Sequence, residues 1–129
     1  MSVKKIKKDV FSVGVLDLDR ELFDELIPLP DGTSYNSYIV KGSEKTALID
    51  CVDPTKEKEL ISNLKKLKLK IDYIIANHAE QDHSGALPRV LKIYPNAKII
   101  TNKKCKEFLK ELLLIPDKKF IVVKDGETI

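Results

Sequence analysis

The chain has 129 residues, of which 43% are hydrophobic and 33% are charged, and its formal net charge is +3. This length suits a single domain, and the composition is typical of a folded soluble protein rather than a disordered segment. The small net charge, with arginine only at Arg20 and Arg89, gives no reason to expect a nucleic-acid partner. No apolar run approaches the roughly 20 residues of a membrane span. The basic N-terminus precedes no apolar signal core, so we expect a cytoplasmic protein.

The first half of the chain is predicted to form a β meander, because short apolar runs alternate with turn-forming residues. The expected strands cover residues 10–16, 22–27, 35–40 and 46–49. Turns are expected at residues 17–20, 28–32 and 41–44. The second of these turns holds two prolines and an Asp-Gly pair, which cannot continue a strand ladder.

After Asp50 the hydrophobic period becomes that of helices separated by short strands. Asp53 and Pro54 suit the N-cap and the first position of a first helix, and Ser84 and Asn102 are expected to cap a second and a third. The predicted apolar stripes are Leu60, Ile61, Leu64 and Leu67; Leu87, Val90, Leu91 and Tyr94; and Cys105, Phe108, Leu109, Leu112 and Leu113. The predicted strands are 71–76, 97–101 and 120–123. Helices that cross between strands favour an α/β fold with a mixed sheet.

The two cysteines, Cys51 and Cys105, lack the spacing of a metal or redox motif. Cys105 lies on the apolar stripe of the third helix, where we expect it to act as a small hydrophobic residue. Cys51 ends a predicted strand, and we expect it to pack behind the loop described next rather than to bind a metal.

Both histidines of the chain lie in one short loop, His-Ala-Glu-Gln-Asp-His, directly after an apolar strand. The candidate metal ligands are His78, Glu80, Asp82 and His83. This alternation of imidazole and carboxylate suits two adjacent cations of intermediate hardness such as iron, manganese or zinc, with His78 and Glu80 facing one and the other pair facing the second. A complete dinuclear site needs more ligands, and the chain has no third histidine.

Two residues near this loop have alternative interpretations. Asp50, at the end of its strand, is a candidate to orient a ligand imidazole. It is equally well explained as a carboxylate that accepts hydrogen bonds from loop amides. Asp82 and His83 alone also fit a pair that caps the second helix.

The segment from His78 to Gly85 resembles the metal motif of the metallo-β-lactamase superfamily. The form with glutamate at the second ligand position is similar to that of flavodiiron proteins (A-type flavoproteins). The run from Phe23 to Tyr38 and the residues Leu48-Ile49-Asp50 also resemble that family. The resemblance extends from about residue 10 to the end of the chain. It implies the N-terminal half of an αββα sandwich.

The glutamate distinguishes two kinds of chemistry. Superfamily hydrolases usually carry a third imidazole at this position, and neutral imidazoles suit zinc acting as a Lewis acid on water. A carboxylate at Glu80 adds negative charge and a harder donor, which favours iron and its higher oxidation state. The resemblance therefore implies reduction of dioxygen to water, or of nitric oxide to nitrous oxide, at a non-haem diiron pair. In the family, electrons come from FMN in a following flavodoxin-like domain.

By this resemblance His78 and Glu80 bind one iron, and Asp82 and His83 bind or face the other. The family's later histidines and bridging aspartate have no counterpart among residues 1–129, and neither has the flavodoxin-like domain. We therefore expect a single partial domain, truncated at its C-terminus, in which the diiron centre is incomplete.

Three hypotheses follow for function. The first is the N-terminal fragment of a flavodiiron oxidoreductase, inactive alone and dependent on a second polypeptide for the remaining ligands and the flavodoxin-like domain. Its implied electron donor is rubredoxin or a reduced flavin or deazaflavin system, and a complete protein would be a homo-oligomer. The second is a zinc hydrolase of the superfamily, against which Glu80 argues. The third is an inactive remnant or an interaction module.

Overall fold

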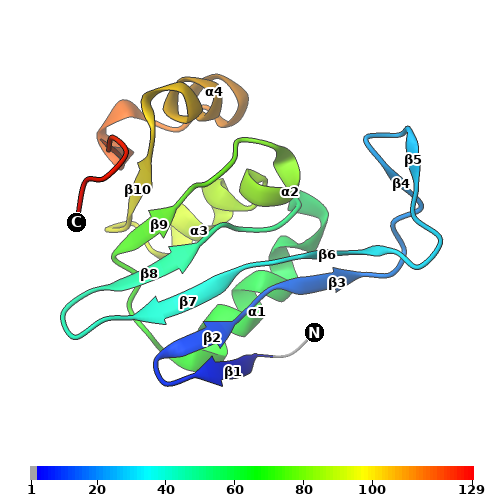
Figure 1. Cartoon of the computed structure of the whole chain (residues 1–129), viewed down its shortest axis with the longest axis horizontal. Helices are drawn as coiled ribbons and strands as arrows, with labels where there is room; N and C mark the ends of the chain where they lie inside the picture. Colours follow the sequence, from blue (N-terminus) through cyan, green and yellow to red (C-terminus); the bar gives the residue numbers. More distant parts are fainter. Residues whose placement is uncertain (1–2) are drawn as a thin grey trace.

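The computed structural model describes residues 3–129 as a mixed β-sheet with helices packed against one of its faces (Figure 1). The strands of the large sheet, in spatial order, are β1 (Lys4–Lys7), β2 (Val10–Ser12), β7 (Tyr38–Lys41), β8 (Thr46–Ile49), β9 (Tyr73–Ile75), β10 (Lys98–Thr101) and β11 (Phe120–Val122). The first four pair antiparallel, and β8 to β11 pair in parallel. The predicted order, a meander followed by alternating helices and strands, is confirmed.

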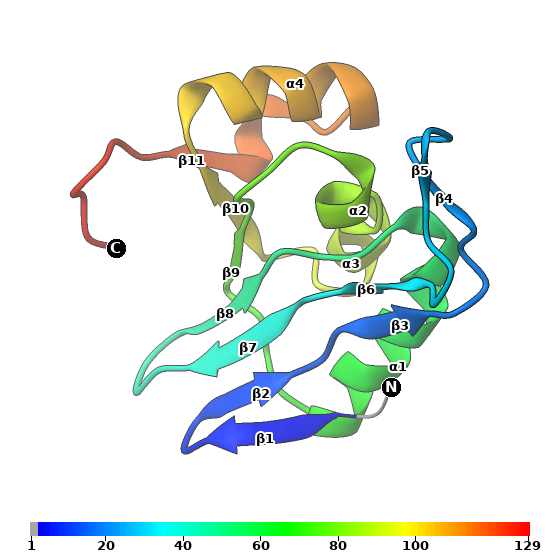
Figure 2. The same cartoon turned by 45° about the vertical axis from the view of Figure 1, so that its right-hand side comes forward.

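The helical elements lie between the parallel strands and shortly beyond them. They are η1 (Pro54–Lys56), α1 (Glu57–Leu67), α2 (Gln81–Ser84), α3 (Leu87–Ile93), α4 (Lys103–Leu113) and η2 (Asp117–Lys119). Helices α1 and α3 lie behind the sheet, and α4 lies at its β10–β11 end (Figure 2). Within residues 3–129 the helices are all too short or too polar to cross a lipid bilayer.

The core forms between the sheet and the helices because one residue in two along each strand points toward them. Strand register aligns a buried apolar row across five strands on this face. The row consists of Ile39, Leu48, Ile74, Ile99 and Phe120. From α1 and α3 the predicted stripe residues Leu60, Leu64, Leu87 and Val90 meet it and are buried.

The single strand expected at residues 10–16 is wrong, because it is two strands in two sheets. After β2 the chain bends, and β3 (Val15–Asp17) pairs with β6 (Thr33–Tyr35) in a separate ribbon. The bend is at Gly14, where a Cβ would lie 2.3 Å from the carbonyl oxygen of Tyr35. The buried Asn63 side chain of α1 donates to the Val13 and Gly14 carbonyls (2.9 and 3.4 Å). These two carbonyls, which leave the strand ladder at the bend, therefore still accept hydrogen bonds.

The strand expected at residues 22–27 is also wrong. It is a small hairpin in which β4 (Leu22–Phe23) pairs with β5 (Ile27–Pro28). Asp24 and Glu25 both have positive φ (51° and 60°) and form the turn between them, which apolar alternation does not reveal. Strand β1 was not predicted, because its sequence Lys-Lys-Ile-Lys is exposed and carries no apolar face.

Two of the three predicted caps are confirmed. The Asp53 carboxylate accepts from the backbone N–H of Thr55 (3.0 Å) at the start of η1, and Asn102 accepts from that of Cys105 (2.8 Å) at the start of α4. Ser84 does not cap a helix, because it lies at the end of α2. The inward position expected for Phe108 and Leu112 is wrong as well, since they are 47% and 66% exposed. Both side chains line a cavity of about 370 Å³ that also borders His78 and Glu80, so they do not pack into the core.

Candidate metal centre

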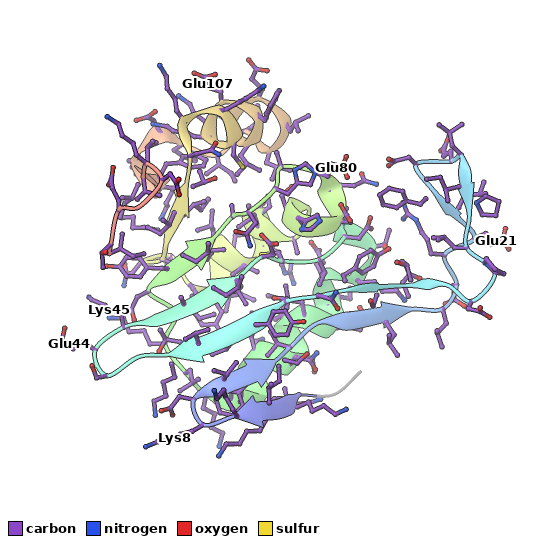
Figure 3. The ribbon with its side chains drawn as sticks, viewed as in Figure 1. Lys8, Glu21, Glu44, Lys45, Glu80 and Glu107 are labelled. Carbon is purple, nitrogen blue, oxygen red and sulfur yellow. The ribbon has the colours of Figure 1, made fainter. Side chains whose placement is uncertain are left out.

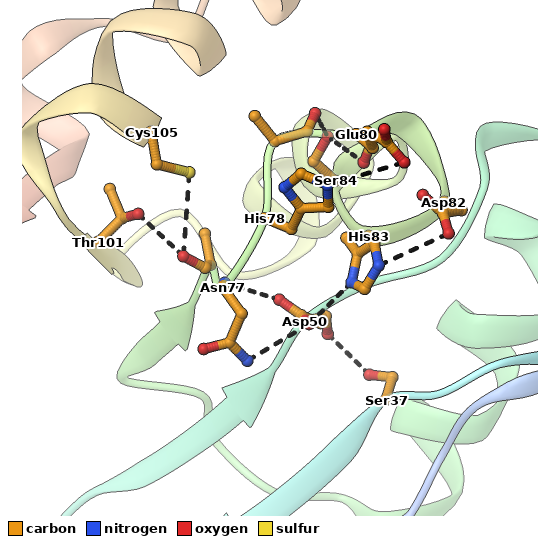
Figure 4. Close-up of polar contacts among 12 residues, drawn as sticks. Ser37, Asp50, Asn77, His78, Glu80, Asp82, His83, Ser84, Thr101 and Cys105 are labelled. Carbon is orange, nitrogen blue, oxygen red and sulfur yellow. Dashed lines mark hydrogen bonds and ion pairs between the residues drawn. The ribbon is translucent and has the colours of Figure 1, made fainter.

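The histidine-containing loop lies at the C-terminal end of β9, as expected, and continues directly into α2. Glu80 is the N-cap of α2, and Asp82 and His83 lie inside the helix, so the interpretation of these two as a capping pair is wrong. The Ser84 hydroxyl is within hydrogen-bonding distance of the carbonyl oxygens of Ala79 (2.7 Å) and Glu80 (3.0 Å). This contact ties the loop to its own helix (Figure 4).

The four candidate ligands form two pairs. The Nε2 atom of His78 lies 3.7 Å from a carboxylate oxygen of Glu80, and both side chains are about half exposed (55% and 50%). The Nε2 atom of His83 lies 3.5 Å from a carboxylate oxygen of Asp82. The imidazole rings of the two pairs meet edge to face with centroids 5.2 Å apart. The loop therefore brings both pairs to one place (Figure 4), and the first pair, which contains the Glu80 labelled in Figure 3, is open to solvent.

Asp50 connects the ends of two strands to the candidate ligands. One carboxylate oxygen lies 3.0 Å from Nδ1 of His83, and the other accepts from the backbone N–H of Asn77 (2.8 Å). The Asn77 side-chain amide donates to the same carboxylate at 3.3 Å. Asp50 itself has a positive φ of 55°. The same carboxylate therefore contacts the His83 imidazole and accepts a hydrogen bond from a loop amide.

Two residues that the sequence analysis did not identify hold Asp50 in place. The Ser37 hydroxyl donates to the Asp50 carbonyl oxygen at 2.7 Å, and Asn77 bonds the carboxylate as described. Both lie beside strand ends at this edge of the sheet, a position that points to a site in α/β folds. Cys51 is buried, and its backbone N–H donates to the His83 carbonyl (2.8 Å). As expected, it packs behind the loop.

The donor types and the pairing fit a divalent or trivalent metal, whereas the number of ligands does not fit a complete site. Across residues 3–129, no three His, Cys, Asp or Glu side chains converge closely enough to hold one ion. Because Nδ1 of His83 is hydrogen-bonded to Asp50, Nε2 is the ring nitrogen that remains to coordinate a metal. This nitrogen faces Asp82. The described residues thus form two candidate half-sites, each of one imidazole and one carboxylate.

A cavity of about 350 Å³ adjoins the second half-site. Its walls combine Tyr38 and Ile49 from the sheet with Asp50, Asp82 and His83 from the site. Tyr35 also lines it, and the Tyr35 hydroxyl donates to Asp17 at 2.7 Å. Burial, together with this hydrogen bond and nearby carboxylates, raises the pKa of Tyr35 well above its usual range. Tyr35 therefore stays protonated, and its single O–H is donated to Asp17 rather than to the cavity.

Comparison with known proteins agrees with this geometry. The profile of the metallo-beta-lactamase superfamily matches residues 30–128. The flavo-diiron protein FprA2 of Clostridium acetobutylicum is 40% identical over 99% of this chain and 32% of its own length. The nitric oxide reductase of Moorella thermoacetica is 34% identical over 96% of this chain and 32% of its own length. The rubredoxin oxygen:oxidoreductase structure from Desulfovibrio gigas superposes with a TM-score of 0.90 at 32% identity, covering 98% of this chain and 32% of that one.

The chain belongs to the metallo-beta-lactamase superfamily. Within it, the resemblance to flavodiiron proteins is confirmed, and the fold is the N-terminal part of their metallo-β-lactamase-like domain. The chain spans about a third of the length of the curated relatives it matches.

Proposed function

We propose that the chain is the N-terminal part of a flavodiiron oxidoreductase that reduces dioxygen to water, nitric oxide to nitrous oxide, or both. The observation that carries the proposal is the pairing of Glu80 with His78 beside the pair Asp82 and His83. A carboxylate at the second ligand position suits iron better than zinc, because an anionic oxygen donor stabilises the ferric state. The names of the Moorella and Desulfovibrio proteins, a nitric oxide reductase and a rubredoxin oxygen:oxidoreductase, support both substrates.

In this proposal His78 and Glu80 hold one iron, and Asp82 and His83 hold or face the second. Bound iron supplies the electron-transfer chemistry, and the chain's own residues position it. Asp50 keeps the His83 ring with Nε2 toward the metal, and Ser37 and Asn77 hold Asp50 in place. The remaining ligands and the FMN domain lie outside residues 1–129, on a second polypeptide or on a continuation of this one, and rubredoxin or a reduced flavin or deazaflavin system supplies electrons. The single partial domain is then inactive alone.

Iron binding is tested by anaerobic titration of the purified chain with ferrous iron. We expect weak binding that Glu80→Ala abolishes, because affinity grows with the number of preorganised ligands. Glu107→Ala is the matched control, since Glu107 is an exposed glutamate on α4 away from the loop. Equal iron retention in the wild type and Glu80→Ala would contradict the ligand assignment.

Activity is tested in a chimera. The chain replaces the matching third of the Clostridium acetobutylicum flavo-diiron protein, which supplies the remainder of the domain. We expect the chimera to consume dioxygen or nitric oxide and His78→Ala within it to lose this activity. A folded, iron-loaded chimera with no activity toward either gas would overturn the proposal.

A further inference from the structure

The small hairpin of β4 and β5 stands away from the large sheet, on the side of α2 (Figures 1 and 2). We call residues 21–29 the arm. Within the described part of the chain, the ladder of β4 and β5 reaches no third strand. At the base of the arm the backbone N–H of Leu29 donates to the Glu21 carbonyl at 2.8 Å. These backbone hydrogen bonds close the arm on itself rather than fasten it to the sheet.

Apolar packing also gives the arm little attachment. Leu22, Leu26 and Ile27 are 42%, 82% and 56% exposed, so they gain little from burial. Phe23 is partly buried and, with Asp24, lines a small cavity between the arm and the metal loop. The position of the arm over this cavity therefore depends on another contact.

Arg20, at the start of the arm, supplies that contact. Its Nε donates to the Leu22 carbonyl in β4 at 3.1 Å, and its Nη1 donates to the Asp53 carboxylate at 3.4 Å. Because the guanidinium is a rigid planar fork, it fixes these two acceptors relative to each other. Asp53 is a firm anchor, since it is 1% exposed and its other oxygen accepts from the N–H and the hydroxyl of Thr55 (3.0 and 2.7 Å).

We propose that Arg20 is a positioning residue, which fixes the arm against the metal loop and thereby closes the cavity between them. The cavity measures about 90 Å³. This space is enough for a few ordered water molecules, because one water needs roughly 10–15 Å³. Its walls come from the arm, the body of the fold and the metal loop, and they consist of Arg20, Phe23, Asp24, Tyr35, Asp53, Glu80, Gln81 and Asp82.

The charges around the cavity give Arg20 a second effect. Of the residues that line it, Arg20 alone is basic, whereas Asp24, Asp53, Glu80 and Asp82 are acidic. The guanidinium therefore offsets repulsion between carboxylates that share a small space. Glu80 and Asp82 provide one carboxylate of each candidate half-site, so a fixed arm limits the access of water to both. This last consequence rests on the proposed function, whereas the attachment of the arm needs no metal.

The first test is hydrogen–deuterium exchange of the metal-free full chain. In Arg20→Ala we expect the amides of the arm to exchange about tenfold faster or more, because a hydrogen bond to a charged group no longer opposes local opening. Amides of β8 and β9 keep their exchange rates. Arg89→Ala is the matched control, since Arg89 is an exposed arginine on α3 away from the arm, and it leaves the exchange of the arm unchanged.

The second test measures closure of the cavity. A neutral gadolinium chelate in solution relaxes protons that solvent reaches, and the amides of Gln81 and Asp82 report on the loop side of the cavity. We expect stronger relaxation of these two amides in Arg20→Ala than in the wild type. Arg20→Lys keeps a cation near Asp53 but lacks the planar fork, so it should give intermediate values in both tests while retaining the stability of the fold.

Three outcomes overturn the inference. The first is unchanged exchange of the arm in Arg20→Ala. The second is equal acceleration in the arm and in β8 and β9, which would make Arg20 a support of the whole fold rather than of the arm. The third is a faster-exchanging arm with unchanged relaxation at Gln81 and Asp82, which would mean that the arm does not close the cavity. All three are measured without iron, so failure here leaves the proposed function standing.

Discussion

The Asp50 carboxylate lies 3.0 Å from Nδ1 of His83, although 33 residues separate the two in the chain. Asp50 directly follows β8 and His83 lies in α2, and the parallel pairing of β8 with β9 brings them to the same edge. The contact leaves Nε2 of His83, 3.5 Å from Asp82, as the nitrogen available to a metal. One strand end thus sets which ring nitrogen of a candidate ligand faces Asp82.

We predict that Asp50→Asn loosens this arrangement without removing a ligand. The amide has no charge to hold the Nδ1–H, so the neutral His83 ring loses its preference for the tautomer with Nε2 unprotonated. Long-range ¹H–¹⁵N correlations of the ring nitrogens measure this preference. For a metal-loaded protein, loss of such a partner costs about 10–100-fold in metal affinity. An unchanged tautomer ratio in Asp50→Asn would show that the contact does not orient the ring.

Glu80→His is predicted to change metal preference. The substitution replaces an anionic oxygen donor with a neutral imidazole, which suits zinc better than iron. We expect the ratio of zinc to ferrous affinity to rise roughly tenfold, which is about 1.4 kcal/mol. Competition between the two metals under anaerobic conditions measures it, with Glu107→His as control. A ratio equal to that of the wild type would count against Glu80 as a ligand.

Gly85→Ala is predicted to destabilise the metal loop. An added Cβ would lie 2.2 Å from Cδ of Pro54 and 2.7 Å from the Gln81 carbonyl, so α2 must move away from η1. Overpacking of this kind costs about 1–3 kcal/mol of unfolding free energy. Chemical denaturation measures it. The control is Gly126→Ala, where no atom lies within 4 Å of the new Cβ and only the positive φ of 84° adds strain. The inference fails if the control is the more destabilised variant.

Asp72→Asn is predicted to lower stability in a pH-dependent way. Its carboxylate accepts from the backbone N–H of Thr46 (2.9 Å) and lies 3.2 Å from the Lys70 ammonium. The hydrogen bond first, and Lys70 in addition, hold the pKa of Asp72 below its usual value. A lowered folded pKa means that the stabilisation is complete above the unfolded pKa of about 3.9 and is lost as pH falls through the folded pKa.

The difference in unfolding free energy between wild type and Asp72→Asn should therefore be constant from about pH 5 to 8 and shrink below about pH 4. Urea denaturation over this range measures it. Asp125→Asn, at an exposed turn residue near the C-terminus, should show little difference at any pH. A difference in unfolding free energy that grows as the pH falls would contradict a lowered pKa of Asp72 in the folded state.

The second half of the fold was predictable because each helix carries its own period and its own cap. Asp53 and Asn102 were identified from residue type alone, and their side chains make the expected bonds. The first half was less predictable, since the bend at Gly14 depends on a carbonyl and an asparagine contributed by distant parts of the chain. Alternation of apolar residues does not distinguish one bent strand from two.

By itself the sequence determined the types of the candidate ligands, their order on one loop and the strand that precedes them, because these are properties of contiguous residues. Only the tertiary structure decided that Asp50 meets His83 and that Ser37 and Asn77 support it. The physical reason is strand register: pairing across the sheet, rather than position along the chain, determines which side chains point the same way and which strand ends meet.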